Sequence, residues 1–137
     1  LPEIITLKDE RSSPVVMGLL LNRGEYVLQL RDKKEGMSEP GVWGLFGGSR
    51  LQYEPHEIAL RREIKEELCI ELGRIDVLCD TKYGRVFVVD ISLLFKDIKL
   101  CEGRGYASLL FEELDGLRLS ATVRAIINYH RARRADG

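Results

Sequence analysis

Residues 62–68 have the sequence REIKEEL, which places three glutamates at helical spacing. At about 100° per residue, Glu66 falls roughly 60° to one side of Glu63 on a helix, and Glu67 roughly 40° to the other. A fold that holds three carboxylates in so narrow an arc normally supplies a cation, and clustered oxygen ligands suit Mg²⁺ or Mn²⁺. Taken alone, such a triplet is more often a solvated acidic helix face. The neighbouring residues therefore have to settle its role.

The residues around the triplet favour metal binding. Gly48 stands six residues before Glu54, and Glu54 stands eight before Arg62. The segment 48–70 thus fits the pattern G-x5-E-x7-R-E-U-x-E-E-x-G-U, where U is a bulky aliphatic residue, with Cys69 in place of the last glycine. This pattern resembles the signature of the Nudix (MutT-like) hydrolases.

Two flanking segments agree with that resemblance. Residues 40–48, PGVWGLFGG, are similar to the P-G-x-W-x-x-P-G-G run that leads into the family's motif, with Phe46 in place of the second proline. Residues 26–31, YVLQLR, are similar to the hydrophobic strand that precedes the metal loop. The resemblance covers most of the chain, and its specificity is concentrated in residues 40–70.

The resemblance implies an α/β fold: a Nudix-type α/β/α sandwich with a mixed β-sheet between helices and a loop-helix-loop catalytic motif. At 137 residues the chain is long enough to bury a core without disulfides or metals, and residues 1–137 are expected to form a single Nudix hydrolase domain.

Hydrophobic periodicity and turn residues predict the individual elements. Strands are expected at residues 14–21, 25–30, 75–80, 85–95 and 107–110. Helices are expected at 55–68 and 117–134, a hairpin turn at 22–24 and a surface loop at 31–41. In the first helix, Leu60, Ile64 and Leu68 recur every four residues beside the carboxylates. Burying this apolar stripe on a sheet would hold the glutamates at the rim of a cleft.

The resemblance also implies roles for the motif residues. Glu66 and Glu67 are expected to bind the metal, and Glu63 to be either a third ligand or the group that orients or deprotonates water. The backbone carbonyl of Gly47 is expected to be a further ligand. The turn at Gly47 and Gly48 is expected to bind the pyrophosphate of the substrate.

Other residues outside the helix have more than one interpretation. Arg31 is either a phosphate-binding arginine, as in relatives, or a plain surface residue. Glu102, in the segment EGRGY, resembles a loop residue that brings a further carboxylate to the metal, and Glu112 and Glu113 are alternatives for that role. The aromatic residues that could stack on a nucleotide base are Phe46, Tyr53, Tyr83 and Tyr106.

Glu54 and Arg62 resemble the family's structural pair, which ties the loop to the helix through a charge-assisted bond. Cys69 is the main departure from the pattern. A glycine there would supply a left-handed helix cap, and a cysteine in that conformation would cost on the order of 1 kcal/mol.

Composition limits the remaining possibilities. The net charge of −1 gives no broad basic excess, so an extended nucleic-acid partner is not favoured. The apolar runs are too short to span a membrane. Three irregularly spaced cysteines have no metal-ligand spacing and favour reduced thiols and a cytoplasmic location.

The expected activity is Mg²⁺-dependent hydrolysis of a phosphoanhydride bond in a nucleoside diphosphate linked to another moiety. Sugar nucleotides, ADP-ribose and nucleoside triphosphates remain open as the small-molecule substrate, and a homodimer remains open as the assembly. One alternative is a non-catalytic nucleotide-binding module with the same fold, although the carboxylates of the motif are all present. The other alternative is an RNA-directed cap hydrolase, which the small size and the charge disfavour.

Overall fold

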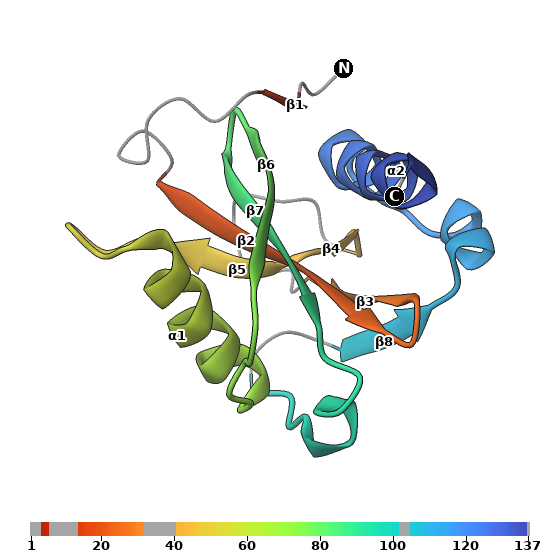
Figure 1. The fold of residues 1–137 in the computed structure, drawn as a ribbon. Helices are drawn as coiled ribbons and strands as arrows, with labels where there is room; N and C mark the ends of the chain where they lie inside the picture. The colour runs from red at the N-terminus through yellow and green to blue at the C-terminus, as the bar shows by residue number, and fades with distance from the viewer. Residues whose placement is uncertain (1–3, 6–13, 32–40, 102–104, 137) are drawn as a thin grey trace.

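The computed structural model describes residues 4–5, 14–31, 41–101 and 105–136. Within these residues, eight strands form a mixed sheet in the order β1-β6-β7-β2-β3-β4, with β5 also paired to β2 and β8 to β3 (Figure 1). The strands are β1 (Ile4–Ile5), β2 (Val15–Asn22), β3 (Glu25–Leu30), β4 (Trp43–Gly44), β5 (Phe46–Ser49), β6 (Asp76–Thr81), β7 (Gly84–Asp90) and β8 (Gly105–Leu109). The helices are α1 (His56–Leu68) and α2 (Ala121–Asp136), with the short 3₁₀ helices η2 (Phe95–Asp97) and η3 (Phe111–Gly116).

The sheet is built around β2, whose sequence VVMGLLLN is almost continuously apolar. Such a run is typical of a strand that is buried on both faces. β2 runs parallel to β7 and antiparallel to β3 and β5. It continues into β3 through Arg23 and Gly24, which have φ angles of 51° and 81°, as a tight hairpin turn requires. The predicted hairpin is confirmed.

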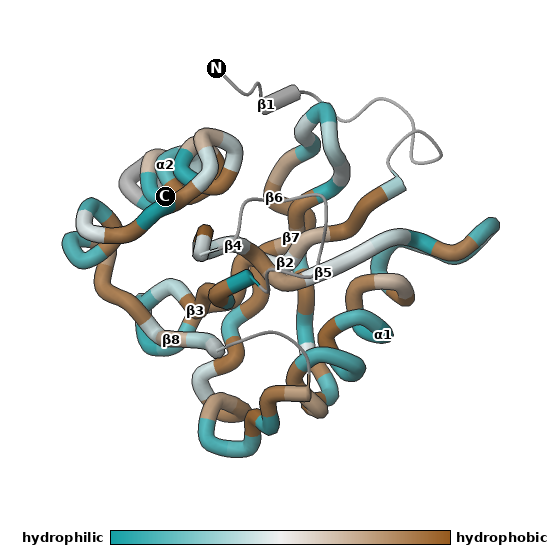
Figure 2. The backbone as a smooth tube through the Cα atoms, turned by 180° about the vertical axis from the view of Figure 1, so that it is seen from behind, coloured by the Kyte–Doolittle hydropathy of each residue, from teal (hydrophilic) through white to brown (hydrophobic). Residues whose placement is uncertain are grey.

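Two hydrophobic clusters lie on opposite faces of the sheet, one under α1 and the other under α2. The predicted apolar stripe of α1, Leu60, Ile64 and Leu68, is fully buried in the first cluster. Ile126 of α2 belongs to the second cluster. Figure 2 shows the hydrophobic backbone segments concentrated in the central strands between these layers. Among the residues that the structure describes, neither helix is long and apolar enough to cross a bilayer.

Two predicted elements extend too far. The strand expected at 85–95 ends at Asp90, because the Asp90 carboxylate accepts hydrogen bonds from both the backbone N–H (2.9 Å) and the hydroxyl (2.6 Å) of Ser92 and so turns the chain. The helix expected at 117–134 begins at Ala121. Ser120 caps it by accepting the backbone N–H of Val123 at 3.2 Å.

The expectation that all three thiols are reduced is wrong for two of them. Cys69 and Cys101, 32 residues apart, form a disulfide, whereas Cys79 is free and buried. The pairing arises because residues 99–101 run along the C-terminal end of α1, where the N–H of Cys101 donates to the carbonyl of Glu67 at 2.9 Å. The cytoplasmic location rested on reduced thiols and loses that support.

Candidate active site

Gly47 and Gly48 of β5 place bare backbone beneath the carboxylates of α1. Gly47 has a φ of +144°, and a Cβ there would collide with the carbonyl oxygen of Val16 on β2. At Gly48 a Cβ would lie 2.5–2.6 Å from the carboxyl atoms of Glu63. The two glycines therefore allow β2, β5 and α1 to approach more closely than larger residues would permit.

Glu67 is held between β5 and β3. Glu67 is only 5% exposed, and its Oε1 accepts a hydrogen bond from the backbone N–H of Gly47 at 3.0 Å. Its Oε2 lies 3.5 Å from Nε2 of Gln29. Burying a carboxylate is tolerated when protein donors replace water, and both oxygens of Glu67 have such a donor.

Glu63 and Glu66 are both close to Arg62. The Nη1 of Arg62 lies 3.2 Å from Oε1 of Glu63 and 3.3 Å from Oε1 of Glu66. The side chain of Glu63 is 15% exposed and lies over Gly48, whereas that of Glu66 is 49% exposed. The structure thus brings Glu63 and Glu67 to the glycine pair and directs Glu66 toward solvent.

Arg62 also pairs with Glu54, which precedes α1. Its Nε and Nη2 each donate to a different oxygen of Glu54 at 2.9 Å, and Nη2 donates to the carbonyl of Ser49 at 3.1 Å. The hydrogen bond from Arg62, followed by that from the backbone of Leu51, lowers the pKa of Glu54 to about 2. The same bond to Glu54 raises the pKa of Arg62. This network holds the loop between β5 and α1 in place and keeps the Glu54 carboxylate charged.

A divalent ion at this place would have to be bound by the same carboxylates. Within the described ranges, no group of three His, Cys, Asp or Glu side chains is arranged to hold a metal ion, and the guanidinium of Arg62 lies close to both Glu63 and Glu66. The chemical type of the available donors nevertheless suits a hard cation. Carboxylate and backbone carbonyl oxygens are the ligands that Mg²⁺ takes, and the missing side chain of Gly48 is what makes room for the Glu63 carboxylate.

Arg31 lies on the carboxylate side of the sheet. A Cβ built on Gly44 would be 3.5 Å from Cδ of Arg31, so this side chain passes over Gly44. Gly44 pairs with Gln29 across β3 and β4, and paired residues project to the same face. That is the face on which Gln29 meets Glu67. The remaining predicted carboxylate, Glu102, lies outside the described residues.

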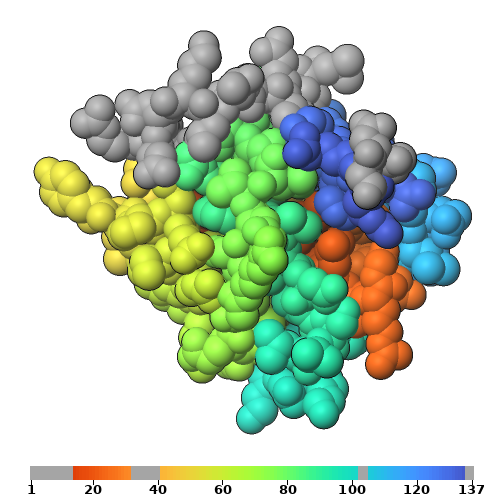
Figure 3. Space-filling view, viewed as in Figure 1, coloured from red at the N-terminus to blue at the C-terminus, as the bar shows by residue number. Residues whose placement is uncertain are grey.

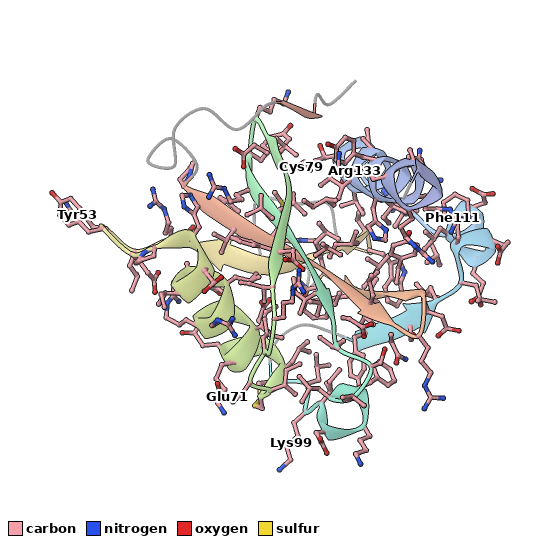
Figure 4. The ribbon with its side chains drawn as sticks, viewed as in Figure 1. Tyr53, Glu71, Cys79, Lys99, Phe111 and Arg133 are labelled. Carbon is pink, nitrogen blue, oxygen red and sulfur yellow. A yellow bond between two sulfur atoms is a disulfide. The ribbon has the colours of Figure 1, made fainter. Side chains whose placement is uncertain are left out.

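The aromatic candidates occupy different environments. Phe46 is fully buried in the cluster under α1, which excludes it as a surface for base stacking. Tyr106 packs edge-on against Phe95 with ring centroids 6.1 Å apart. Tyr53 is 90% exposed and points away from the fold at the loop before α1 (Figure 4). Tyr83 is 51% exposed in the turn between β6 and β7.

Gln29 is a further residue of the candidate site that no sequence motif indicated. Gln29 is 7% exposed. Its Nε2 donates a hydrogen bond to the carbonyl of Leu45 at 2.9 Å and also approaches Oε2 of Glu67. The signal that could have identified it is one amide-bearing residue inside the buried strand EYVLQL. A buried polar side chain in such a strand needs a partner, and here one partner is a carboxylate of the candidate site.

An open cavity of about 390 Å³ lies between the β2–β3 hairpin and residues 92–96. In Figure 3 these segments are the orange and teal surfaces at the lower right. The residues that line the cavity are Asn22, Arg23, Glu25, Ser92, Phe95 and Lys96. None of them is a predicted site residue, so this cavity is not the carboxylate site.

A family model matches most of this sequence, and curated relatives match a shorter part of it. The family model described as the NUDIX domain matches residues 11–118. Nucleoside triphosphatase NudI of Klebsiella pneumoniae (strain 342) is 43% identical to this chain over 58 residues, which are 42% of this chain and 40% of that protein. The chain thus spans about two fifths of the length of this curated relative.

Solved structures with the same architecture are more distant in sequence. The MutT NUDIX hydrolase from Burkholderia pseudomallei has a TM-score of 0.65 and 21% identity, covering 85% of this chain and 96% of that chain. The NUDIX domain of Shewanella oneidensis NrtR, crystallised with ADP ribose, has a TM-score of 0.66 and 17% identity, covering 93% of this chain and 90% of that chain. These likenesses establish the fold, a mixed sheet between helices.

Proposed function

The chain belongs to the NUDIX domain family, and on that premise we propose that it hydrolyses a phosphoanhydride bond in a nucleoside diphosphate linked to another moiety. The observation that carries this proposal is the contact between two carboxylates of α1 and the glycine pair of β5. Glu67 accepts the N–H of Gly47, and Glu63 lies over the bare Cα of Gly48. These contacts support a site in which carboxylate oxygens bind a metal ion next to a backbone that a phosphate could approach.

In this proposal the residues of the motif divide the work. Glu66, Glu67 and the carbonyl of Gly47 would hold Mg²⁺ or Mn²⁺, with Glu102 as a further carboxylate. Glu63 either joins them or orients and deprotonates the attacking water. An ion bound there supplies charge neutralisation of the diphosphate and a water of lowered pKa.

The residues around the motif position the substrate. Arg31, on the carboxylate face of the sheet, contributes a permanent positive charge for a phosphate. Glu54 and Arg62 keep the loop after β5 in place and do not contact the substrate. Positioning and charge neutralisation account for most of the rate enhancement in phosphoryl transfer, which supports this division of roles.

The substrate class stays broad. The similarity to NudI, a nucleoside triphosphatase, supports a nucleoside triphosphate, and the NrtR domain crystallised with ADP ribose supports ADP-ribose. Sugar nucleotides share the same diphosphate. The net charge of −1 supports a small nucleotide rather than an extended nucleic acid.

The test is a panel of nucleoside triphosphates, ADP-ribose and sugar nucleotides incubated with the protein and Mg²⁺ in ¹⁸O-labelled water. Mass spectrometry of the products shows which phosphate receives the label and therefore which bond is cut. We expect metal-dependent cleavage of at least one diphosphate, abolished by EDTA. A folded protein that cleaves none of them would refute the proposed activity.

A non-catalytic nucleotide-binding module is the second candidate, because one observation favours it. Arg62 pairs with both Glu63 and Glu66, and in the part of the chain that the structure describes no three potential ligands are arranged to hold a metal ion. Calorimetry with the same panel separates the two functions. Binding that does not need Mg²⁺ and leads to no product would support the module.

A further inference from the structure

The Gln29 side chain is a buried amide at the junction of three elements. It belongs to β3, and β3 pairs with β4 on one side and with β8 on the other. Its Nε2 bonds the carbonyl of Leu45, which lies between β4 and β5, at 2.9 Å, and lies 3.5 Å from Oε2 of Glu67 on α1. The amide nitrogen of Gln29 therefore connects Leu45, two residues before Gly47, with the carboxylate of Glu67 on α1.

The two donors around Glu67 restrict its carboxylate. Gly47 donates to Oε1 at 3.0 Å, and Gln29 approaches Oε2 from the other side. Each carboxylate oxygen has lone pairs for more than one partner, so the contacts with Gly47 and Gln29 are compatible with binding to a cation. The two donors thus favour one orientation of the carboxylate.

We propose that Gln29 is a positioning residue that holds Glu67 in the orientation in which it binds a divalent cation. This inference rests on the proposed function, since it concerns the same carboxylate. Residues that hydrogen-bond a metal ligand orient it, and their loss weakens metal binding by about 10- to 100-fold. Gln29 has the burial, the donor and the contact that this role requires.

The test is Gln29→Met, which keeps the length of the side chain and removes the donor. Mn²⁺ binding to the folded protein is titrated by electron paramagnetic resonance in the absence of any nucleotide. We expect the dissociation constant for Mn²⁺ to rise about tenfold. In steady-state assays kcat should fall while KM for the nucleotide stays the same, because the proposed role of Gln29 is exerted on Glu67 and not on the substrate.

Asn22→Leu is the matched control. It also removes a side-chain amide from a strand, since Nδ2 of Asn22 donates to Oγ of Ser108 at 3.1 Å, but it contacts none of the carboxylates in α1. We expect its Mn²⁺ affinity to equal that of the wild type. A double variant adds a second check: in a Glu67→Gln background, Gln29→Met should cause no further loss of affinity.

The outcomes separate this inference from the proposed function. If the wild type neither binds Mn²⁺ nor cleaves any nucleotide of the panel, the proposed function fails. If it cleaves a nucleotide but does not bind Mn²⁺ alone, the role of Gln29 is overturned. If the wild type binds and Gln29→Met binds equally well, only the role of Gln29 is overturned.

A measurement on the wild type covers the case in which the variant does not fold. Mg²⁺ should shift the side-chain amide resonance of Gln29 in an NMR spectrum and leave that of Asn22 in place. An unmoved Gln29 resonance at saturating Mg²⁺ would overturn the inference.

Discussion

The guanidinium of Arg62 holds the carboxylate of Glu54 through two N–H···O bonds of 2.9 Å each. Paired bonds between charged groups are roughly twice as strong as neutral ones and fix the orientation of both partners. Arg62 also donates to the carbonyl of Ser49, so one side chain of α1 binds both ends of the loop 49–54. The loop in turn sets how closely β5 approaches α1, and therefore the contact between Gly48 and Glu63.

Replacing Glu54 by Gln should lower the free energy of unfolding at neutral pH by about 2 kcal/mol, the usual contribution of hydrogen bonds to a charged partner. The difference should also depend on pH. Because the folded-state pKa of Glu54, about 2, lies below its ordinary value of 4.5, the stabilisation is complete above pH 4.5 and is lost as the pH falls toward 2. Urea unfolding of both proteins over this pH range measures it.

Glu57→Gln is the control for that prediction. Glu57 pairs with Arg61 at 4.0 Å, and its side chain is 56% exposed. Such a surface pair contributes less than about 1 kcal/mol, so this variant should barely change the stability. A Glu54→Gln difference that stays constant down to pH 2 would show that the ion pair is not its source.

The parts of the fold that the sequence predicted correctly depend on neighbouring residues. Leu60, Ile64 and Leu68 recur once per helical turn, so their burial against the sheet follows from spacing alone. The β2–β3 hairpin follows from two apolar runs around Asn22-Arg23-Gly24. The approach of Glu63 to Gly48 was expected only through the resemblance, because no local rule joins a glycine turn to a helix face.

The parts that the sequence did not predict depend on distant contacts. β4 and β5 are too short to show a periodic pattern, and they form because β3 and β2 lie beside them. Cys69 and Cys101 meet because residues 99–101 run along the end of α1, which their spacing of 32 residues does not reveal. Gln29 was missed for the same reason, since its partner Glu67 is 38 residues away.

Glu67→Gln should reduce kcat by about 100-fold or more, the range found when a group that handles charge or protons in the transition state is lost. The fold should survive, because the amide oxygen of Gln can still accept the N–H of Gly47. The measurement is kcat on the best substrate, with thermal melting to verify folding. Glu57→Gln, an exposed glutamate on the same helix, should retain full activity; equal activity in both variants would remove Glu67 from the mechanism.

Gly48→Ala should lower kcat on the order of 10- to 100-fold, because small displacements of a catalytic group have effects of that size. The added methyl would lie 2.5–2.6 Å from the carboxyl atoms of Glu63 and would push them aside. The melting temperature should change little, since the end of a flexible side chain can move. The comparison is Gly116→Ala, where a Cβ meets nothing within 4 Å. A fully active Gly48→Ala would mean that the position of Glu63 does not matter.

The disulfide predicts a specific pattern of thiol reactivity. Without reductant, the native protein should contain no thiol that reacts rapidly with Ellman's reagent. Cys69 and Cys101 are bonded to each other, and Cys79 is buried, which raises the pKa of its thiol to about 11. Treatment with dithiothreitol should expose Cys69 and Cys101 as fast-reacting thiols. Rapid reaction before reduction would contradict the bond.

Two variants separate the disulfide from the helix cap. Cys69 ends α1 in the left-handed conformation, with φ 59° and ψ 35°. Cys101→Ser removes the bond and leaves a cysteine in that conformation, whereas Cys69→Gly removes the bond and supplies the residue that suits it. Cys101→Ser should lower the free energy of unfolding by about 4 kcal/mol, the effect expected from losing a bridge across a loop of 32 residues. In Cys69→Gly the loss in free energy of unfolding should be smaller than in Cys101→Ser by on the order of 1 kcal/mol, because glycine has no steric penalty there.

Chemical unfolding of both variants measures these losses, and turnover well below the melting temperature should be unchanged in each. A large loss of turnover in Cys69→Gly alone would mean that its thiol takes part in the reaction.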